Sequence, residues 1–372
     1  MTVLVTGGAG YLGSVVVPKL VNLGIRTRVV DAGHFGWGGL APVMTEIERI
    51  DGDIRDFDPE WLDGVRAVIH LAGLSNDPTA DFNQRANMEM NVAGTIKVAE
   101  ACKAKGVSRF VLASSASVYY THEGSLDDPM MAEDTPVAPN ANYSRSKWLG
   151  ERALFEMADE SFSPSALRMG TLFGWSPRMR FDLVINTFLK DAVLNGRLTV
   201  HQGGEMYRPL LGINDAADGY ISMIHQPVEL ISARTFNLVH KNYMVVSLAH
   251  FVKHILDRDL GVKIEVDVIP RDSSAPSRSY RMSGDLIRSE LGIRADRGAA
   301  EEVVKIWQHL QTDKLDLKAP IHYNIAQLKS LIEGGELDAE TLRRQSCKSS
   351  SSAPRGNSET TSAKRSKAAA TV

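Results

Sequence analysis

The run Thr6-Gly-Gly-Ala-Gly-Tyr-Leu-Gly13 constrains the fold of this chain more than any other stretch. It follows Val3-Leu-Val5, which is typical of a buried strand, and it leads into an apolar helical pattern that continues to Leu23. Glycines at positions 7, 10 and 13 allow a tight turn in which the backbone approaches a phosphate closely. The N–H groups and the dipole at the start of the following helix favour the same anion. The alternative is an ordinary turn between a strand and a helix.

The next segment supports a nucleotide site. Arg26-Thr-Arg-Val-Val30 is typical of a second buried strand, and it ends at Asp31, 18 residues past Gly13. In dinucleotide-binding βαβ units, an acidic residue near this position binds the ribose 2′-hydroxyl. Because a carboxylate would repel a 2′-phosphate, we expect NAD rather than NADP as the cofactor. Arg26 and Arg28 are the two residues that argue for NADP instead.

Three further strand patterns extend the alternation of strands and helices. They are Ile47–Ile54, Ala67–Leu71 and Arg109–Ala113, with an amphipathic helical pattern from about residue 86 to 105 between the last two. Strands that alternate with helices predict the α/β class and a Rossmann-like, doubly wound parallel sheet. Ligands of such sheets bind outside the carboxyl ends of the strands.

Small and polar residues follow these strands at the expected binding edge. Asp53 and Ile54 end the third strand, where we expect Asp53 to face the adenine amine. Leu71-Ala-Gly73 closes the fourth strand with small residues that let a cofactor come close. Ser114-Ser-Ala-Ser-Val-Tyr119 follows the fifth strand, and Asn91 lies on the long helix. The coincidence of these residues at one edge predicts a cofactor site there.

The second half of the chain breaks the alternation. Ser165–Met169 and Thr235–Val239 are typical of core strands, but the pattern weakens from Gly170 onward, and Leu210–Asp218 indicates a return to the sheet. We therefore expect an NAD-binding domain and a smaller α/β substrate-binding domain on its C-terminal side. The expected ranges are 1–172 with about 210–245 for the first, about 173–209 with 246–313 for the second, 314–340 for a C-terminal appendage, and 341–372 for a polar, disordered tail.

The composition argues against several other classes of protein. A net charge of −3 gives no excess of basic residues for binding nucleic acid. No run reaches 18 apolar residues, so we expect no membrane span. Cys102 and Cys347 lie far apart, so we expect neither a disulfide framework nor a metal site. Because the N-terminus has no basic segment before an apolar one, we expect a cytoplasmic protein.

Tyr143 and Lys147 form a pair that carries chemistry in such a context. Their spacing of four residues places both side chains on one face of a predicted helix. An ammonium beside a phenol favours the phenolate and lowers the pKa of the phenol, so the pair can act as a general base near neutral pH. Taken alone, the spacing also fits a solvated helix face.

Together and in this order, these motifs resemble the extended short-chain dehydrogenase/reductases. More narrowly, the chain looks like their NAD-dependent nucleotide-sugar epimerase/dehydratase branch, over about residues 2 to 295. The resemblance implies that NAD stays bound through the catalytic cycle and that the substrate is a nucleoside-diphosphate sugar. It rests on the glycine run, Asp31, Asp53, His70-Leu-Ala-Gly73, the serine run at 114–119 and Tyr143-x-x-x-Lys147.

The resemblance also implies roles for individual residues. Tyr143 is the catalytic base, Lys147 lowers its pKa and holds the nicotinamide ribose, and Ser115 hydrogen-bonds the sugar oxygen, with Ser114 or Ser117 assisting. The cofactor residues are Gly7, Gly10, Tyr11, Leu12, Gly13, Asp31, Asp53, Ile54, Leu71, Ala72, Gly73, Asn91, Tyr143 and Lys147. The substrate residues are Ser117, Asn186, Arg208 and Arg278, the two arginines as bidentate clamps on a diphosphate. For each arginine taken alone, a surface salt bridge is the alternative.

Three departures from the branch pattern concern the substrate. Dehydratases of the branch carry Thr-Asp-Glu and decarboxylases Thr-Ser-Glu where this chain has Ser115-Ala-Ser117, so no acid is in place there to protonate a leaving hydroxyl. Tyr119-Tyr120 replaces the usual Tyr-Gly, and Leu211-Gly-Ile213 replaces a strand with His-Val. These changes disfavour 4,6-dehydration and leave the sugar open.

We therefore expect an epimerase that inverts a nucleoside-diphosphate sugar at C4 through a transient 4-keto intermediate. The alternatives are an NAD(P)-dependent sugar-nucleotide dehydrogenase or a 4-ketosugar reductase and, less favoured, a 4,6-dehydratase, a decarboxylase or a non-catalytic NAD sensor. The helices at 86–105 and 143–158 carry apolar residues on more than one side. Family members commonly pair these helices, which implies a homodimer; burial within one subunit is the alternative.

Overall fold

The computed structural model describes residues 1–119, 129–272 and 279–345. Its centre is a seven-stranded sheet in the order β10-β6-β5-β4-β1-β2-β3, in which every neighbouring pair is parallel. The Rossmann-like fold expected from the alternation of strands and helices is therefore confirmed. The strands are β1 (Thr2–Thr6), β2 (Arg26–Asp31), β3 (Ile47–Asp51), β4 (Val65–His70), β5 (Arg109–Ser115), β6 (Ser163–Met169) and β10 (Arg234–Leu238).

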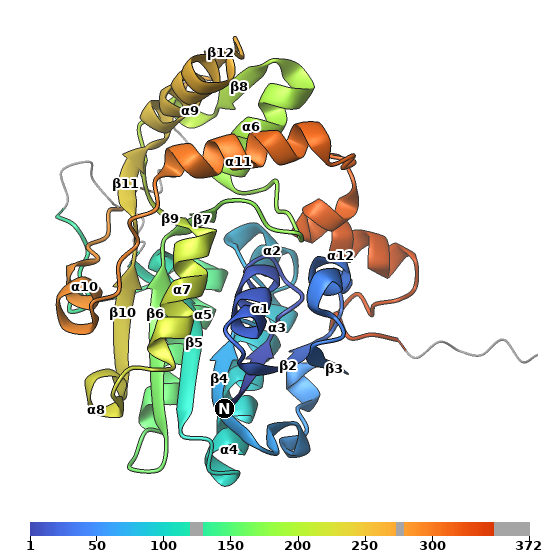
Figure 1. Ribbon diagram of the computed structural model, residues 1–372, viewed down its shortest axis with the longest axis vertical. Helices are drawn as coiled ribbons and strands as arrows, with labels where there is room; N and C mark the ends of the chain where they lie inside the picture. The colour runs from blue at the N-terminus through green and yellow to red at the C-terminus, as the bar shows by residue number, and fades with distance from the viewer. Residues whose placement is uncertain (120–128, 273–278, 346–372) are drawn as a thin grey trace, which may run out of the picture.

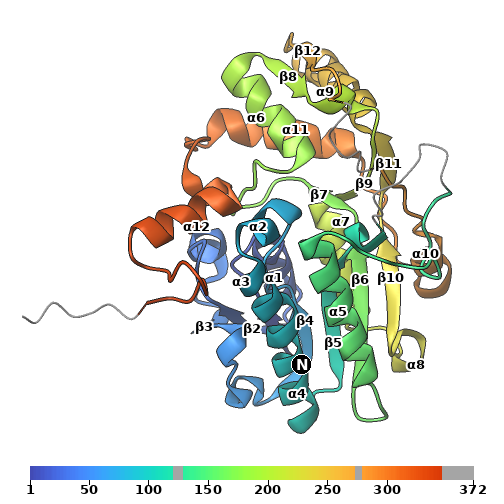
Figure 2. The ribbon, with the colours of Figure 1, turned by 180° about the vertical axis from the view of Figure 1, so that it is seen from behind.

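Helices cover both faces of this sheet (Figures 1 and 2). One face carries α1 (Gly13–Asn22) and α7 (Ile213–Met223), and the other carries α4 (Thr95–Ala104) and α5 (Asn142–Glu156). Side chains of a strand alternate between the two faces. Val3 and Val5 accordingly belong to the core beneath α1 and α7, whereas Leu4 belongs to the core beneath α4 and α5.

The segment after Leu210 differs from the expected return to the main sheet. β9 (Tyr207–Gly212) instead lies between β7 (Thr171–Phe173) and β11 (Lys241–Met244) in a separate three-stranded sheet. Helix α7 begins at Ile213 because the buried positions that follow, among them Ile213, Ala216, Ala217 and Tyr220, recur at helical rather than strand spacing. A salt bridge of 2.6 Å between Lys19 and Asp218 then joins α7 to α1.

A smaller lobe lies above the carboxyl edge of the main sheet (Figure 1). It contains α6 (Val184–Asn195), α9 (Val245–Leu260), α11 (Ala299–Thr312) and a two-stranded parallel sheet of β8 (Arg197–Val200) and β12 (Glu265–Val268). Helix α10 (Asp285–Leu291), expected in the substrate-binding domain, lies beside β10 at the edge of the main sheet, where Glu290 pairs with Arg234 at 2.6 Å. The remaining α-helices are α2 (Asp77–Phe82), α3 (Gln84–Met88), α8 (Val228–Ile231) and α12 (Asn324–Glu333).

The C-terminal part of the chain packs back onto the main sheet domain. Residues 341–345, expected to begin a disordered tail, are held in place: Leu342 is fully buried and Arg344 forms a β-bridge with Leu337. The prediction failed here because Leu337 and Leu342 pack into an apolar cluster with residues from distant parts of the chain. The polar composition around them does not reveal this cluster. The rest of the expected tail, 346–372, lies outside the described residues. Across the described ranges, no helix combines the length and apolar character that a membrane span requires.

Candidate active site

A cavity of about 650 Å³ lies at the carboxyl ends of the main strands, beneath the smaller lobe. The turn after β1, the loop after β2, the loop after β4 and the end of β5 all contribute to its lining. Because parallel strands bring their carboxyl ends to one edge, motifs that lie far apart in the sequence meet here. All the residues predicted to bind the cofactor line this cavity except Asn91.

The glycine turn is shaped by close backbone contacts. Gly7 has a φ of +70°, and a Cβ added there would lie 2.6 Å from the backbone nitrogen of Ala72. A Cβ on Gly13 would lie 2.4 Å from the carbonyl oxygen of Gly8, so neither position accepts a side chain. The glycine turn and the start of α1 therefore expose backbone N–H groups to the cavity without covering side chains at Gly7, Gly10 and Gly13. This arrangement suits the pyrophosphate of a dinucleotide. The residues present fit NAD at this end of the site.

Asp31 lies at the end of β2 and lines the cavity, as expected. Its carboxylate accepts hydrogen bonds from the backbone N–H groups of Ala9 at 3.0 Å and Gly33 at 2.8 Å. Burial raises the pKa of this carboxyl, and the two N–H groups oppose the shift. Arg26 and Arg28, which argued for NADP, both pair with Glu48 on β3 at 2.6 and 2.5 Å and lie outside the lining.

Asp53 also lines the cavity, but its carboxylate is already engaged. Both oxygens accept from the Nε of Arg55 at 3.0 Å, and Oδ2 accepts from Nη2 at 2.5 Å. Burial would raise the pKa of Asp53, but the hydrogen bonds from Arg55 outweigh it and leave that pKa lowered. The expected contact with an adenine amine therefore depends on the lone pairs that Arg55 leaves open.

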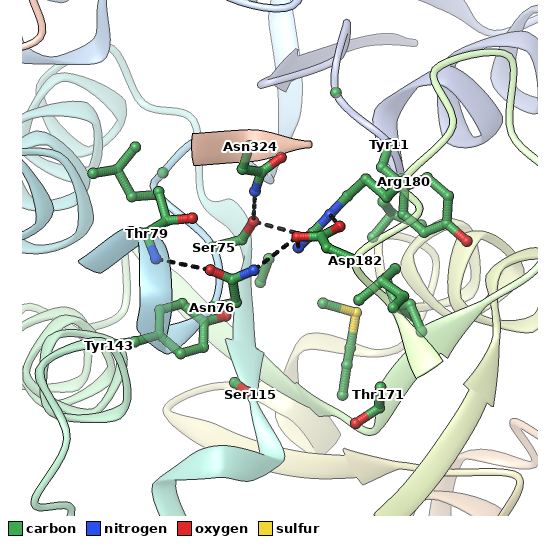
Figure 3. A pocket seen from close by; sticks show the side chains of 18 of the residues that line it. Tyr11, Ser75, Asn76, Thr79, Ser115, Tyr143, Thr171, Arg180, Asp182 and Asn324 are labelled. Carbon is green, nitrogen blue, oxygen red and sulfur yellow. Dashed lines mark hydrogen bonds and ion pairs between the residues drawn. The ribbon is translucent and has the colours of Figure 1, made fainter. Parts of the chain in front are cut away.

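Ser115, Tyr143 and Lys147 come together at the centre of the cavity. Ser115 ends β5, and the other two lie on the first turns of α5. The side chain of Ser115 lies near the phenol of Tyr143 and favours its ionised form, and the hydroxyl of Ser117 donates to the Ser115 Oγ at 3.0 Å. The Nζ of Lys147 lies 6.0 Å from the centre of the Tyr143 ring. Figure 3 shows Tyr143 and Ser115 facing the same space.

Burial controls the protonation of this pair. It raises the pKa of Tyr143 to about 12, against the lowering effect of the nearby Ser115 side chain. It lowers the pKa of Lys147 to about 8, against the opposing charge of Glu151. We expected the charge of Lys147 to bring the pKa of the phenol below its usual value. That expectation left out the removal of water from both groups, which raises the pKa of the phenol and lowers that of the ammonium. In this structure desolvation is the larger effect.

A buried ion pair between Glu151 and Arg168 lies next to the Tyr143–Lys147 part of α5. The carboxylate of Glu151, one turn after Lys147 on α5, receives Arg168 Nη2 at 2.7 Å and a hydrogen bond from the hydroxyl of Ser114. Arg168 also donates to the Tyr119 hydroxyl at 2.8 Å. These contacts join α5 to the ends of β5 and β6. The Ser114 hydroxyl is therefore engaged by Glu151, whereas the Ser117 hydroxyl is the one that hydrogen-bonds Ser115.

Two predicted site residues lie behind the cavity lining. Asn91 is buried against Gly73, and its amide donates to the carbonyl of Leu74 at 3.0 Å, so it supports the loop after β4. The amide of Asn186 donates to the Tyr11 hydroxyl at 3.0 Å and to the carbonyl of Arg180 at 2.9 Å. Asn186 therefore lies outside the cavity lining, with its side chain turned inward from α6, and its predicted contact with a sugar diphosphate stays a prediction.

The two predicted arginine clamps have different outcomes. Arg208 lines the cavity, with its guanidinium 5.8 Å from the centre of the Tyr280 ring and its Nη1 donating to the carbonyl of Tyr207 at 2.8 Å. Arg278 lies outside the described residues, so its role stays a prediction. Among the described residues, no group of three or more His, Cys, Asp or Glu side chains is placed to hold a metal ion.

Sequence reasoning missed four charged residues of the cavity lining, Asp77, Arg178, Arg180 and Asp182. Arg180 forms two hydrogen bonds with Asp182, at 2.9 and 2.8 Å, and a third with Ser75 at 3.0 Å. Arg178 stacks on Phe35, 3.8 Å from the ring centre, and burial lowers its pKa to about 9. The signal was present: two arginines occur within Ser176-Pro-Arg-Met-Arg-Phe-Asp182, where the strand and helix pattern breaks.

A C-terminal residue, Asn324, was also missed. Its Nδ2 donates to Ser75 Oγ at 3.0 Å, and its Oδ1 accepts from Arg178 Nη2 at 2.8 Å. The neighbouring Asn76 has a φ of +72° and donates to Asp182 at 2.9 Å. Figure 3 shows the contacts of Asn324 with Ser75 and of Asn76 with Asp182 above Tyr143 and Ser115. Nothing in the local sequence around Asn324 connects it to a site about 250 residues earlier.

Comparisons with known proteins agree with this geometry. The model of the NAD-dependent epimerase/dehydratase family matches residues 3–238. UDP-glucose 4-epimerase of Bacillus subtilis (strain 168) is 25% identical over 342 residues, which cover 83% of this chain and 96% of that enzyme. UDP-glucuronic acid decarboxylase 1 of Danio rerio is 26% identical over 266 residues, which cover 68% of this chain and 62% of that protein. The chain thus spans less than two thirds of the latter relative.

Solved structures show the same fold. MoeE5 in complex with UDP-glucose and NAD has a TM-score of 0.70 and 25% identity, and the match covers 84% of this chain and 99% of that one. UDP-glucuronic acid 4-epimerase from Bacillus cereus, in complex with UDP-glucuronic acid and NAD, has a TM-score of 0.71 at 20% identity, with 84% of this chain and 99% of that one covered. The second likeness is one of fold alone.

Proposed function

The chain belongs to the NAD-dependent epimerase/dehydratase family, and from this premise we propose that it is an epimerase of a nucleoside-diphosphate sugar. NAD is its cofactor. The proposed reaction inverts C4 of the sugar through a transient 4-keto intermediate. The observation that carries the proposal is the meeting of Ser115, Tyr143 and Lys147 in the cavity that the glycine turn also lines.

The three side chains have distinct roles in this reaction. Tyr143 takes the proton of the C4 hydroxyl during oxidation and returns it during reduction, while the Ser115 hydroxyl hydrogen-bonds the same sugar oxygen. Lys147 supplies a nearby ammonium and a donor for the nicotinamide ribose. Bound NAD supplies the hydride acceptor and a formal positive charge, which favours the phenolate of Tyr143 against the effect of burial. Hydride returns to the opposite face, so no net oxidation occurs.

Cationic side chains support a diphosphate as part of the substrate. Arg208 lines the cavity from β9, and Arg178 lines it from the loop after β7. Arg180 is largely neutralised by Asp182, which makes it a weaker candidate. We assign Arg208 to the diphosphate of the sugar nucleotide, and Arg278 stays a predicted second clamp. Arginine suits this role because it forms bidentate, charge-assisted bonds with phosphate oxygens.

The turn after Ser115 favours epimerisation over elimination. Ala116 is buried in the 3-10 turn Ala116–Tyr119, so this turn presents no carboxylate to a leaving hydroxyl. Besides Asp31 and Asp53, which are assigned to the cofactor, the carboxylates of Asp77 and Asp182 line the cavity from other elements, and Asp182 is paired with Arg180. The second candidate, a sugar-nucleotide dehydrogenase or 4-ketosugar reductase, would use the same triad but release its cofactor in a changed oxidation state.

Incubation with UDP-glucose, the substrate named in several relatives, tests the proposal. The expected result is conversion to the C4 epimer, seen by chromatography of the sugar nucleotide, with no NADH released. Release of one NADH per turnover would instead establish the dehydrogenase. Loss of carbon dioxide from UDP-glucuronic acid, or loss of water from the sugar, would establish a decarboxylase or a dehydratase.

We further propose that the enzyme is a cytoplasmic homodimer. The pairing surface would be formed by the helical segments 86–105 and 143–158, and the partly exposed apolar residues of the second include Trp148 and Leu149. A monomer in light scattering at micromolar concentration would rule out the dimer. Fluorescence of a tagged chain confined to a compartment other than the cytoplasm would rule out the location.

A further inference from the structure

The segment from residue 313 to 345, here called the strap, crosses the cofactor side of the cavity. It leaves the smaller lobe at the end of α11, continues through α12 and ends beside the loops that follow β2 and β3 (Figures 1 and 2). The loops after β2, β3, β4 and β7, all of which it touches, carry residues of the cavity lining. The strap therefore contacts the loops that form the wall of the cavity.

The first contact is with the loop after β2. The Nε2 of Gln327 donates to the carbonyl of His34 at 3.0 Å, and Nη2 of Arg344 donates to the carbonyl of Gly33 at 2.7 Å. The same Gly33 donates its N–H to the carboxylate of Asp31. His34 and Phe35 line the cavity, whereas Gln327 and Arg344 do not. The strap thus fixes the backbone beside the residue assigned to the cofactor ribose without needing to touch the ligand.

The second contact is with the segment after β3. Arg55, which is buried and holds the carboxylate of Asp53, also donates to the carbonyls of Thr341 and Leu342 in the strap. An exposed ion pair between Arg343 and Asp56 lies next to it. The guanidinium of Arg55 consequently binds the cavity lining and the strap at the same time.

The third contact enters the cavity itself. Asn324 joins Ser75, on the loop after β4, to Arg178, on the loop after β7. Figure 3 shows its hydrogen bond to Ser75. Asn324 is the residue of the strap that lines the cavity. Because Arg178 is buried and stacked on Phe35, the Asn324 amide fixes a cation whose position would otherwise depend on that stacking.

An apolar anchor keeps the strap in place. Three of its leucines are almost completely buried in a cluster with side chains from the loop after β4 and from α3 and the turn that follows it. Such a cluster resists partial detachment, because exposing any one leucine removes burial from its neighbours. The cluster consists of Leu74, Ala86, Met90, Leu328, Leu337 and Leu342.

We propose that the strap retains NAD: it closes the adenosine side of the cavity, and the cofactor dissociates only after the strap detaches. An epimerase benefits from such a device because its cofactor returns to the starting oxidation state in each cycle and need not leave. The inference rests on NAD as the cofactor and is independent of which sugar is bound.

The test measures the exchange of bound NAD in the absence of a sugar nucleotide. Holoprotein is mixed with excess fluorescent etheno-NAD, and the rate at which the analogue replaces NAD is followed for wild type and for the double variant Gln327→Ala/Arg344→Ala. Since each substitution removes one hydrogen bond between the strap and the loop after β2, we expect exchange to be faster by about 10- to 30-fold. Glu333→Ala, an exposed change on the same helix, is the matched control and should leave the rate unchanged.

A second variant keeps the proposal testable if two hydrogen bonds are too few to release the strap. Leu342→Ala removes a fully buried side chain of the anchor, and hydrogen exchange of the strap amides reports how often the strap opens. The proposal requires that NAD exchange accelerates together with strap opening. Faster opening with unchanged NAD exchange would overturn it, as would wild type that exchanges NAD within seconds. A variant that exchanges NAD rapidly yet epimerises sugar with excess NAD supports the strap and leaves the proposed function intact.

Discussion

The Nζ of Lys147 lies 6.0 Å from the centre of the Tyr143 ring, one helical turn further along α5. Both side chains are inside the cavity that also contains the glycine turn. The two groups share a desolvated site, so each has a shifted pKa: about 12 for the phenol and about 8 for the ammonium. The site thus holds a lysine close to its titration point and a phenol that needs positive charge to ionise.

The lysine should make the fold sensitive to alkaline pH. Its pKa falls from 10.5 when exposed to about 8 when buried, so between these values the unfolded chain binds more protons than the native one. The free energy of unfolding therefore rises with pH across that window, because deprotonation removes the buried charge. Below about pH 8 the ammonium stays charged, and its burial destabilises the native state by the full amount. Replacing Lys147 with Met should raise the free energy of unfolding at pH 7 by up to roughly 3 kcal/mol.

Urea denaturation of wild type and Lys147→Met, at a series of pH values from 7 to about 10.5, provides the measurement. The advantage of the variant should shrink steadily as the pH rises, because deprotonation removes the cost in wild type. An advantage that stays constant with pH would show that packing, and not charge burial, separates the two proteins.

Tyr143 is expected to be needed for chemistry and not for folding. Tyr143→Phe keeps the ring and removes the hydroxyl that lies near Ser115 in the cavity. The rate of epimerisation should fall by about 100- to 10,000-fold, the range for loss of a general acid–base group. Circular dichroism and the amount of co-purified NAD should match wild type. A variant that retains the wild-type rate would remove the phenol from the mechanism.

The ion pair behind the site should be important for stability. Glu151→Gln leaves the guanidinium of Arg168 buried without its carboxylate, which should lower the free energy of unfolding by about 3–5 kcal/mol. The double variant Glu151→Gln/Arg168→Met removes the uncompensated charge and should recover part of the loss. Thermal denaturation of the three proteins measures both effects. A double variant that is no more stable than Glu151→Gln would contradict this explanation.

Arg208 is expected to act on the substrate and not on the cofactor. Arg208→Ala should raise KM for UDP-glucose by about 10- to 100-fold, since a charge-assisted bond to the diphosphate is lost, while NAD exchange stays unchanged. Arg197→Ala is the control, because Arg197 is exposed on β8 and pairs only loosely with Asp267, at 3.9 Å. Steady-state kinetics that show no change in KM for Arg208→Ala would assign the diphosphate to other groups.

The motifs predictable from sequence are those whose geometry is local. A glycine turn, an acid at the end of β2 and the Tyr143–Lys147 spacing each depend on a few neighbouring residues, and so does the alternation that predicts the parallel sheet. Leu210–Asp218 misled the prediction because a short apolar run fits a strand as well as the start of a buried helix.

The residues that sequence reasoning missed depend on tertiary contacts. Arg178 and Arg180 reach the cavity because the loop after β7 folds back over the glycine turn, and Asn324 reaches it because the strap returns across the domain. Asn186 has the residue type of a substrate ligand, but α6 directs it toward Tyr11. The pKa of Tyr143 was also beyond sequence reasoning, since it depends on how completely the cavity excludes water.

In the proposed epimerisation, one hydride leaves C4 of the sugar and returns to the same carbon within the same active site. UDP-glucose carrying deuterium at C4 tests it directly, with the sugar products analysed by NMR and mass spectrometry. The account predicts the C4 epimer with the deuterium retained at C4 and no deuterium in free NADH. Loss of the label from C4, or its appearance in released NADH, would contradict the account.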